Sequence, residues 1–234
     1  MMLLTVVPDP EHVAHPAAEW LEAEIAASIR ARGGCALGLA GGRTPEPVYR
    51  ELAQAADIAW SRVSVFFSDE RAVPPDHVES NYRMVRSALL ARVPIPAASV
   101  HRMEAERADR DQAAREYERL LPAALDILVL GVGQDGHTAS LFPGSPALHE
   151  QRRLVLPVVG TKSPADRMTI TPPVIASAHR IAVIATGADK AAVVARALEG
   201  PIAPEEVPAQ LARRGAWFLD RAAAGRLTAV RVGV

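Results

Sequence analysis

Short apolar runs alternate with longer segments of helical periodicity along most of the chain. Runs typical of strands occur at residues 35–40, 63–67, 127–131, 154–159, 180–186 and 228–232. Helical patterns occur at residues 16–32, 45–56, 81–91, 107–121, 188–198, 208–213 and 220–225. Strands that alternate with helices need crossover connections. The pattern therefore predicts an α/β fold, a mostly parallel sheet with helices on both faces.

No repeat or linker-like stretch divides the 234 residues, so we expect a single domain over residues 1–234. The Pro- and Glu-rich segment 201–208 is short enough to be a surface loop. In a parallel sheet the carboxyl ends of the strands share one edge, and ligands bind outside it. The loops that follow the predicted strands are therefore the expected place for a functional site.

Composition narrows the classes of partner. The chain has 26 Lys and Arg against 27 Asp and Glu, a formal charge of −1, which argues against nucleic acid as the main ligand. The lone Cys35 excludes an internal disulfide and reads as a small core residue. Neither a signal-peptide pattern nor an apolar run of about 20 residues is present, so we expect a cytoplasmic protein without a membrane anchor.

The first strand-end loop is Gly41-Gly42-Arg43-Thr44-Pro45. Two glycines allow close approach to the backbone, and Thr44 is placed to cap a helix that begins at Pro45. A helix start of this kind can bind an anion. The glycine spacing matches neither the dinucleotide-binding fingerprint nor the P-loop. The loop is thus a candidate phosphate site, although an ordinary tight turn before a capped helix would use the same residues.

The second loop, Ser68-Asp69-Glu70-Arg71, directly follows the predicted strand at 63–67. Arg71 is a candidate contact for an anionic or carbonyl oxygen, and Asp69 for orientation or proton handling. A solvated turn with mixed charges is the competing interpretation.

The third loop carries the most informative pattern. Glycines from Gly131 onward surround Asp135 and His137 at the end of a predicted strand, in a run that continues to Gly144. An imidazole can take a proton from water near neutral pH, and Asp135 can hold the geometry or fix the tautomer. Ser140 lacks the Gly-x-Ser-x-Gly setting of serine esterases. The pattern favours attack by an activated water over a serine nucleophile.

Two cationic segments follow later strands. One places Lys162 five residues before Arg167, and the other ends at Lys190. Either segment can be plain surface, but together with Arg71 and the loop at Thr44 they supply donors for a phosphate. No histidine spacing matches a zinc motif, so we expect neither a metal nor a cofactor.

Taken together, these motifs resemble the 6-phosphogluconolactonases in order and spacing, from Gly38 to Ala223. The resemblance rests on Gly41-Gly42-x-Thr-Pro, Ser68-Asp-Glu-Arg, Ser80-Asn81, Leu130 through Gly144, Lys162 with Arg167, Thr186-Gly-Ala-Asp-Lys190 and Trp217-Phe-Leu-Asp220 with Ala222-Ala223. One departure is Arg43, where the family usually has Ser, so that Arg43 is either an extra phosphate contact or a solvent-facing side chain. The other is the segment around Lys162, which is poorer in proline than usual.

The resemblance implies a modified Rossmann-like fold shared with glucosamine-6-phosphate deaminases and ribose-5-phosphate isomerases. It implies hydrolysis of 6-phospho-D-glucono-1,5-lactone to 6-phosphogluconate in the oxidative pentose phosphate pathway, a carboxylic ester hydrolysis. His137 is then the general base, and Arg71 and Lys162 contact the substrate. The implied partner is this small phosphorylated lactone, and the protein is expected to be a monomer or a small homo-oligomer.

Two alternatives differ in identifiable residues. The related deaminases place a carboxylate in an Asn-Glu-Pro run after the Gly-His pair, whereas this chain has Phe142 at that position. Isomerisation needs the additional acid–base group, but lactone hydrolysis does not. A non-catalytic sugar-phosphate sensor can lose the base and often carries a DNA-binding module. This chain keeps Asp135 and His137 and has no spare N-terminal domain.

Overall fold

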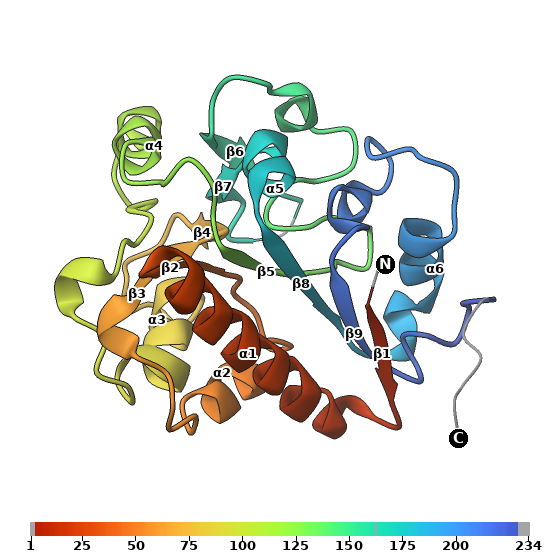
Figure 1. The fold of residues 1–234 in the computed structure, drawn as a ribbon. Coiled ribbons are helices and arrows are strands. Elements are labelled where there is room, and N and C mark those ends of the chain that lie inside the picture. Colours follow the sequence, from red (N-terminus) through yellow and green to blue (C-terminus); the bar gives the residue numbers. More distant parts are fainter. Residues whose placement is uncertain (1–2, 162, 229–234) are drawn as a thin grey trace.

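The computed structural model describes residues 3–161 and 163–228. Six strands form a fully parallel sheet in the order β1-β9-β8-β5-β2-β3 (Figure 1). Their bounds are Leu4–Val7 (β1), Cys35–Leu39 (β2), Val63–Phe67 (β3), Ile127–Gly131 (β5), Arg180–Ala185 (β8) and Ala216–Asp220 (β9). The predicted α/β class and the mostly parallel sheet are confirmed.

A second, antiparallel sheet lies beside the carboxyl end of β3. It has the order β4-β7-β6, with β4 at Asp69–Arg71, β6 at Val155–Val159 and β7 at Asp166–Ile170. The strand predicted at residues 154–159 therefore exists but belongs to this smaller sheet. Strands β1, β4, β7 and β9 were not predicted. β1 is a run of only four half-buried residues, β4 is a charged tripeptide, and β7 begins with Asp166-Arg167. β9 is fully buried, and its last residue was instead placed at the start of the helix predicted at residues 220–225.

Helices cover both faces of the parallel sheet. The α-helices are Ala14–Arg32 (α1), Glu46–Leu52 (α2), Asn81–Val85 (α3), Arg110–Glu118 (α4), Pro172–Ser177 (α5) and Ala191–Leu198 (α6). A π-helical turn, Arg86–Leu90, continues α3, and short 3₁₀ turns span Pro10–His12, Trp60–Arg62, Ala97–Ser99, Pro146–His149, Ala188–Lys190 and Pro208–Ala212. Helices α1 and α2 pack against each other on one face, and α5 and α6 both pack against the turn at Pro208–Ala212 on the other, as expected for right-handed crossovers in this strand order.

Helix α1 shows how the sequence forms the core. Ala17, Leu21 and Ile25 are spaced by four, so they share one helix face, and each is fully buried. This face packs against β2, β5 and β8. Gly33 ends the helix in the left-handed conformation (φ 80°) and donates its N–H to the Ile29 carbonyl at 2.8 Å.

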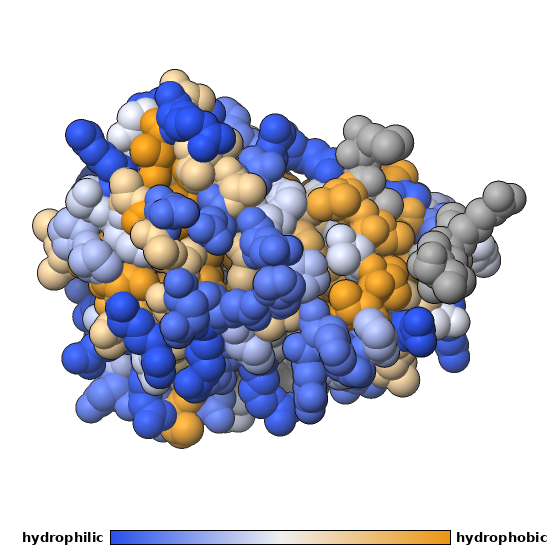
Figure 2. Space-filling view, turned by 60° about the horizontal axis from the view of Figure 1, so that its bottom comes forward, coloured by the Kyte–Doolittle hydropathy of each residue, from blue (hydrophilic) through white to orange (hydrophobic). Residues whose placement is uncertain are grey.

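Other predicted elements differ near the end of the chain. The helix predicted at residues 220–225 is a series of turns, because the Asp220 carboxylate accepts the Ala223 N–H at 2.8 Å and closes a tight turn. The strand predicted at 228–232 lies outside the described residues beyond Thr228, which is in a bend. None of the helices in the described part of the chain has the length and apolar character that a bilayer crossing needs. Figure 2 shows a face on which hydrophilic side chains predominate, with smaller patches of apolar side chains between them.

Candidate active site

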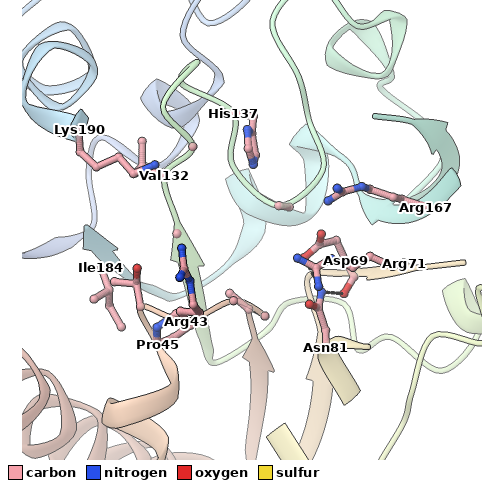
Figure 3. Close-up of a pocket in the computed structure, with 17 residues that line it drawn as sticks. Arg43, Pro45, Asp69, Arg71, Asn81, Val132, His137, Arg167, Ile184 and Lys190 are labelled. Atoms are coloured by element: carbon pink, nitrogen blue, oxygen red, sulfur yellow. Dashed lines mark hydrogen bonds between the residues drawn. The ribbon is translucent and has the colours of Figure 1, made fainter. Parts of the chain in front are cut away.

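A cavity of about 220 Å³ opens at the carboxyl ends of the parallel strands (Figure 3). The loops after β2, β5 and β8, together with β4 and β7, supply its walls. Of the residues predicted from sequence, the cavity is lined by Gly41, Gly42, Arg43, Thr44, Asp69, Arg71, His137, Arg167 and Lys190. Asp135 contacts His137 but is not part of the lining, and Lys162 lies outside the described residues.

The pair of Asp135 and His137 has the geometry of an oriented imidazole. The Nδ1 atom of His137 lies 2.5 Å from Oδ1 of Asp135, and the backbone N–H of His137 donates to the same oxygen at 3.2 Å. A proton on Nδ1 leaves Nε2 as the free acceptor of a neutral ring. Figure 3 shows the imidazole projecting over the cavity, where a water molecule could reach it.

The electrostatics of Asp135 suit this orienting role. Partial burial raises the pKa of Asp135, whereas the hydrogen bond from His137 and the charge of His137 lower it. The lowering effects are larger, and the resulting pKa is about 2. The carboxylate is therefore charged at every pH at which the protein is expected to work. A charged carboxylate at this position favours a positive charge on the neighbouring imidazole.

The glycines around the pair are required by close contacts. A Cβ atom on Gly133 would lie 2.0 Å from Nδ1 of His137 and 2.6 Å from Oδ1 of Asp135. Gly136 has a φ of 90°, and Ala139, which lines the cavity, has a φ of 48° that L-residues rarely adopt. The expectation that glycines shape this loop to present Asp135 and His137 agrees with these contacts.

Asp69 is buried and its carboxylate is held from both sides. Oδ1 accepts hydrogen bonds from Ser68 Oγ at 3.2 Å and Asn81 Nδ2 at 3.3 Å. Oδ2 accepts from Ser140 Oγ at 2.7 Å. Because each oxygen is hydrogen-bonded within the protein, the orienting role predicted for Asp69 fits better than proton transfer.

Asn81 joins two loops of the site and was not assigned a role from the sequence. Its Nδ2 atom also donates to the Asp69 carbonyl at 2.8 Å, and its Oδ1 faces Gly41, where a Cβ atom would lie only 1.7 Å away. Glu70 anchors this region: its carboxylate accepts the N–H groups of Asn81 and Tyr82, each at 2.8 Å. Burial raises the pKa of Glu70, partly offset by these hydrogen bonds.

Ser140 is the second site residue without a predicted role. It was considered only as a nucleophile, whereas its hydroxyl bonds Asp69 and accepts from Arg167 Nη1 at 3.4 Å. For Asn81, the sequence feature that could have indicated a role in the site was its place beside Ser80 in the family motif. The sequence does not reveal the contact between Ser140 and Asp69, because the two residues are 71 positions apart.

Among the described residues, four cations lie in two groups around the cavity (Figure 3). Arg43 and Lys190 lie on one side, and Arg71 and Arg167 lie beside Asp69 on the other. Arg71 donates to the Glu79 carbonyl at 2.5 Å, and Lys190 Nζ lies 3.7 Å from an Asp189 carboxylate oxygen. Burial lowers the pKa of Arg167, but guanidinium groups stay charged in proteins.

The capping prediction for Thr44 is wrong. Helix α2 begins at Glu46 and its N-cap is Pro45, which makes no side-chain capping bond. Pro45 already has helical dihedrals (φ −79°, ψ −14°), so the helix starts one residue later than expected and Thr44 remains in the preceding turn. Thr44 still lines the cavity, and it does so as part of that turn.

Metal ligands do not cluster in the part of the chain that the structure describes. Residues 3–161 and 163–228 contain no group of three or more His, Cys, Asp or Glu side chains arranged to hold an ion. The expected independence from metals and cofactors stays a prediction.

Comparison with known proteins gives a consistent result. Residues 8–219 match the model of the family described as glucosamine-6-phosphate isomerases/6-phosphogluconolactonase. A 6-phosphogluconolactonase of Synechocystis sp. is 38% identical over 216 residues, which cover 87% of this chain and 89% of the relative. The structure of 6-phosphogluconolactonase from Trypanosoma brucei matches with a TM-score of 0.84 and 30% identity, over 97% of this chain and 99% of that one.

The fold is also similar to that of a protein with a different activity. The structure of a monomeric glucosamine-6-phosphate deaminase matches with a TM-score of 0.83 at 24% identity, covering 96% of this chain and 100% of that chain. At this identity the match shows the fold alone. The predicted Rossmann-like fold shared with such deaminases is confirmed.

Proposed function

We propose that this chain, which belongs to the glucosamine-6-phosphate isomerase/6-phosphogluconolactonase family, hydrolyses 6-phospho-D-glucono-1,5-lactone to 6-phospho-D-gluconate. This reaction is a step of the oxidative pentose phosphate pathway. The observation that carries the mechanism is the imidazole of His137, fixed by Asp135 at 2.5 Å over a cavity with four cations. An oriented base beside an anion site fits the hydrolysis of a phosphorylated ester.

The reaction proceeds by direct attack of water. Nε2 of His137 takes a proton from the water as its oxygen bonds to C1 of the lactone, which forms a tetrahedral oxyanion. The C1 to ring-oxygen bond then breaks, and the ring oxygen leaves as the C5 hydroxyl after it takes the proton from His137. Charged Asp135 stabilises the intervening imidazolium, and Arg71 stabilises the oxyanion.

The substrate phosphate binds at the side of the cavity formed by Arg43 and Lys190. Figure 3 places these cations opposite Arg71 and Arg167, so a sugar ring can extend between the two groups. Gly41, Gly42 and Thr44 add backbone and hydroxyl donors near Arg43. Arg167 adds a positive charge beside the reacting carbonyl, and Lys162 is expected to add a further contact to the substrate.

Isomerisation is less well supported by the cavity. Among its described lining residues Asp69 is the only carboxylate, and both of its oxygens accept hydrogen bonds from neighbouring side chains. Proton transfer between adjacent sugar carbons needs an additional acid–base group. Lactone hydrolysis needs only one base, which His137 supplies.

The proposal includes the surroundings in which the protein works. We propose that it works in the cytoplasm. We also propose that residues 1–234 are a single domain and that the protein is a monomer or a small homo-oligomer. Size-exclusion chromatography with light scattering measures the oligomeric state.

A lactone consumption assay tests the proposed function. Purified protein is mixed with freshly made 6-phosphogluconolactone in the presence of EDTA, and lactone loss is compared with the spontaneous rate at the same pH. We expect clear acceleration that dialysis against EDTA does not reduce. A rate equal to the spontaneous one contradicts the activity, and a loss that zinc or magnesium restores contradicts activation of water by His137 alone.

A further inference from the structure

We propose that Phe142 is a positioning residue that holds the imidazole of His137 and the guanidinium of Arg167 at the cavity; this inference rests on the proposed function. Phe142 is only 5% exposed and does not line the cavity. Its ring centroid lies 4.7 Å from that of the His137 imidazole, at an interplanar angle of 43°. The Arg167 Cζ atom lies 5.6 Å from the same Phe142 centroid.

The space for this arrangement depends on Gly160. A Cβ atom at this position would lie 2.9 Å from Cζ of Phe142 and 3.0 Å from Nε of Arg167. Both distances are too short for unstrained contact, so a side chain here would displace the ring or the guanidinium. The phenyl ring and the guanidinium therefore pack together under a backbone that carries no side chain.

Phe142 supplies a restraint that the hydrogen bond of Asp135 does not. The contact between Nδ1 and Asp135 determines which ring nitrogen is free, but a single hydrogen bond allows the imidazole plane to tilt about it. The phenyl ring packs against the imidazole and limits this tilt. Asp135 thus selects the reactive nitrogen, and Phe142 sets the direction in which Nε2 points.

The same ring also places a cation. A guanidinium is attracted to the negative face of an aromatic ring. Arg167 is further tied by hydrogen bonds from Nε to the Pro164 carbonyl at 3.1 Å and from Nη1 to Ser140 Oγ at 3.4 Å. Phe142 thereby links the general base, on the loop after β5, to a cation on β7, and the distance between these groups is held constant.

Substitution of the ring separates this role from ordinary packing. Phe142→Leu keeps an apolar side chain but removes the aromatic face. Phe66→Leu is the matched control, because Phe66 is 3% exposed and its ring stacks on His101 at 4.7 Å, away from the cavity lining. Small displacements of a catalytic group cost roughly tenfold to hundredfold in rate, so kcat of Phe142→Leu should fall at least about tenfold.

The experiment measures kcat, KM and the proton NMR signal of the His137 Nδ1–H, which is identified by its loss in His137→Ala. Phe142→Leu should keep native circular dichroism, lose kcat more than it raises KM, and weaken this signal through solvent exchange. Phe66→Leu should retain kcat and the signal. If Phe142→Leu does not fold, Phe142→Met replaces it.

Two outcomes overturn the inference: a folded Phe142 variant with kcat within about twofold of wild type and an unchanged Nδ1–H signal, or an equal loss of kcat in Phe66→Leu. Failure of the proposed function itself is distinguishable. A wild-type protein without lactonase activity would contradict the function, while the NMR signal would still show whether Phe142 restrains His137.

Discussion

The two carboxylate oxygens of Asp69 accept different numbers of hydrogen bonds from side chains. Oδ1 accepts from both Ser68 and Asn81, whereas the side-chain donor that the structure shows at Oδ2 is Ser140. An unsatisfied buried acceptor costs about 1–3 kcal/mol. Loss of the Ser140 hydroxyl should therefore disturb Asp69 more than loss of the Ser68 hydroxyl.

This difference can be measured with two matched substitutions. Ser140→Ala should lower kcat about tenfold and reduce the free energy of unfolding by about 1–3 kcal/mol, because Oδ2 loses its donor. Ser68→Ala leaves Asn81 on Oδ1 and should have a smaller effect on both quantities. Steady-state kinetics and urea denaturation of the two variants test this order. Equal kcat values for both variants and wild type would show that Asp69 needs no such anchoring.

Site residues could be predicted from the sequence where the residues that interact are close together in the chain. Asp135 and His137 stand out because glycines surround them in the chain, and the structure confirms that they form a pair. Asn81 and Ser140 act through Asp69, 12 and 71 positions away. Such contacts depend on how the two sheets meet, so no local pattern reveals them.

Among the elements, the turn that carries Lys190 is anchored by the end of a distant strand. The N–H of Gly187 donates to both carboxylate oxygens of Asp220, at 3.0 and 3.1 Å, and the Ala223 N–H donates to one of them. Asp220 is fully buried at the end of β9. Its carboxylate therefore fixes the backbone three residues before Lys190.

An isosteric change at Asp220 should weaken substrate binding. Asp220→Asn presents an amide donor to the backbone N–H groups, so we expect KM to rise several-fold while kcat changes little. Asp126→Asn is the control, because Asp126 is also buried and accepts a backbone N–H, from Ala36 at 2.7 Å, at the start of β5. Kinetics and thermal melts of both variants decide the matter. A KM that rises equally in both, or in neither, would refute a specific link from Asp220 to the phosphate side.

Several apolar strands were predictable, although the equally buried β9 (Ala216–Asp220) was missed. The runs at 63–67 and 127–131 agree with β3 and β5 to the residue, because both strands are largely buried and bounded by polar or glycine residues. Strand β4 could not be predicted, because all residues of Asp69–Arg71 are charged and pair with β7, almost 100 positions later. The tertiary pairing of β4 and β7 outweighs the local preferences of their residues.

At the scale of the molecule, positive charge is concentrated at one edge of a nearly neutral protein. The formal charge is −1, yet Arg43, Arg71, Arg167 and Lys190 come from four separate segments to line a single cavity. Parallel topology brings the loops of Arg43 and Lys190 to the edge where the strands of the main sheet end, and the antiparallel sheet adds Arg71 and Arg167, which pair across β4 and β7. A doubly charged phosphate is the ligand that this concentration of charge favours.

Phosphate selectivity is therefore a property of the assembled cavity. A hydrogen bond to a charged group contributes about 1.5–3 kcal/mol, so Lys190→Ala should lower kcat/KM for 6-phosphogluconolactone at least about tenfold. Unphosphorylated gluconolactone should be a poor substrate, and Lys190→Ala should change its kcat/KM little. Measuring kcat/KM of the wild type and of Lys190→Ala on both lactones separates the contact to the phosphate from any other effect of the substitution. Similar kcat/KM values for the two lactones with the wild-type protein would show that the phosphate site is wrongly placed.

The most direct measurement compares kcat of His137→Ala with that of the wild type, with the spontaneous opening of the lactone subtracted at each pH. General-base assistance typically contributes about 10²–10⁴ in rate, so kcat should fall by that factor while 6-phosphogluconate still binds. The hydrogen bond and charge of His137 hold the pKa of Asp135 at about 2, so this carboxylate stays charged at mildly acidic pH and does not cause a loss of activity there. A His137→Ala protein with nearly normal kcat would contradict the general-base role of His137 and make Asp69 the next candidate base.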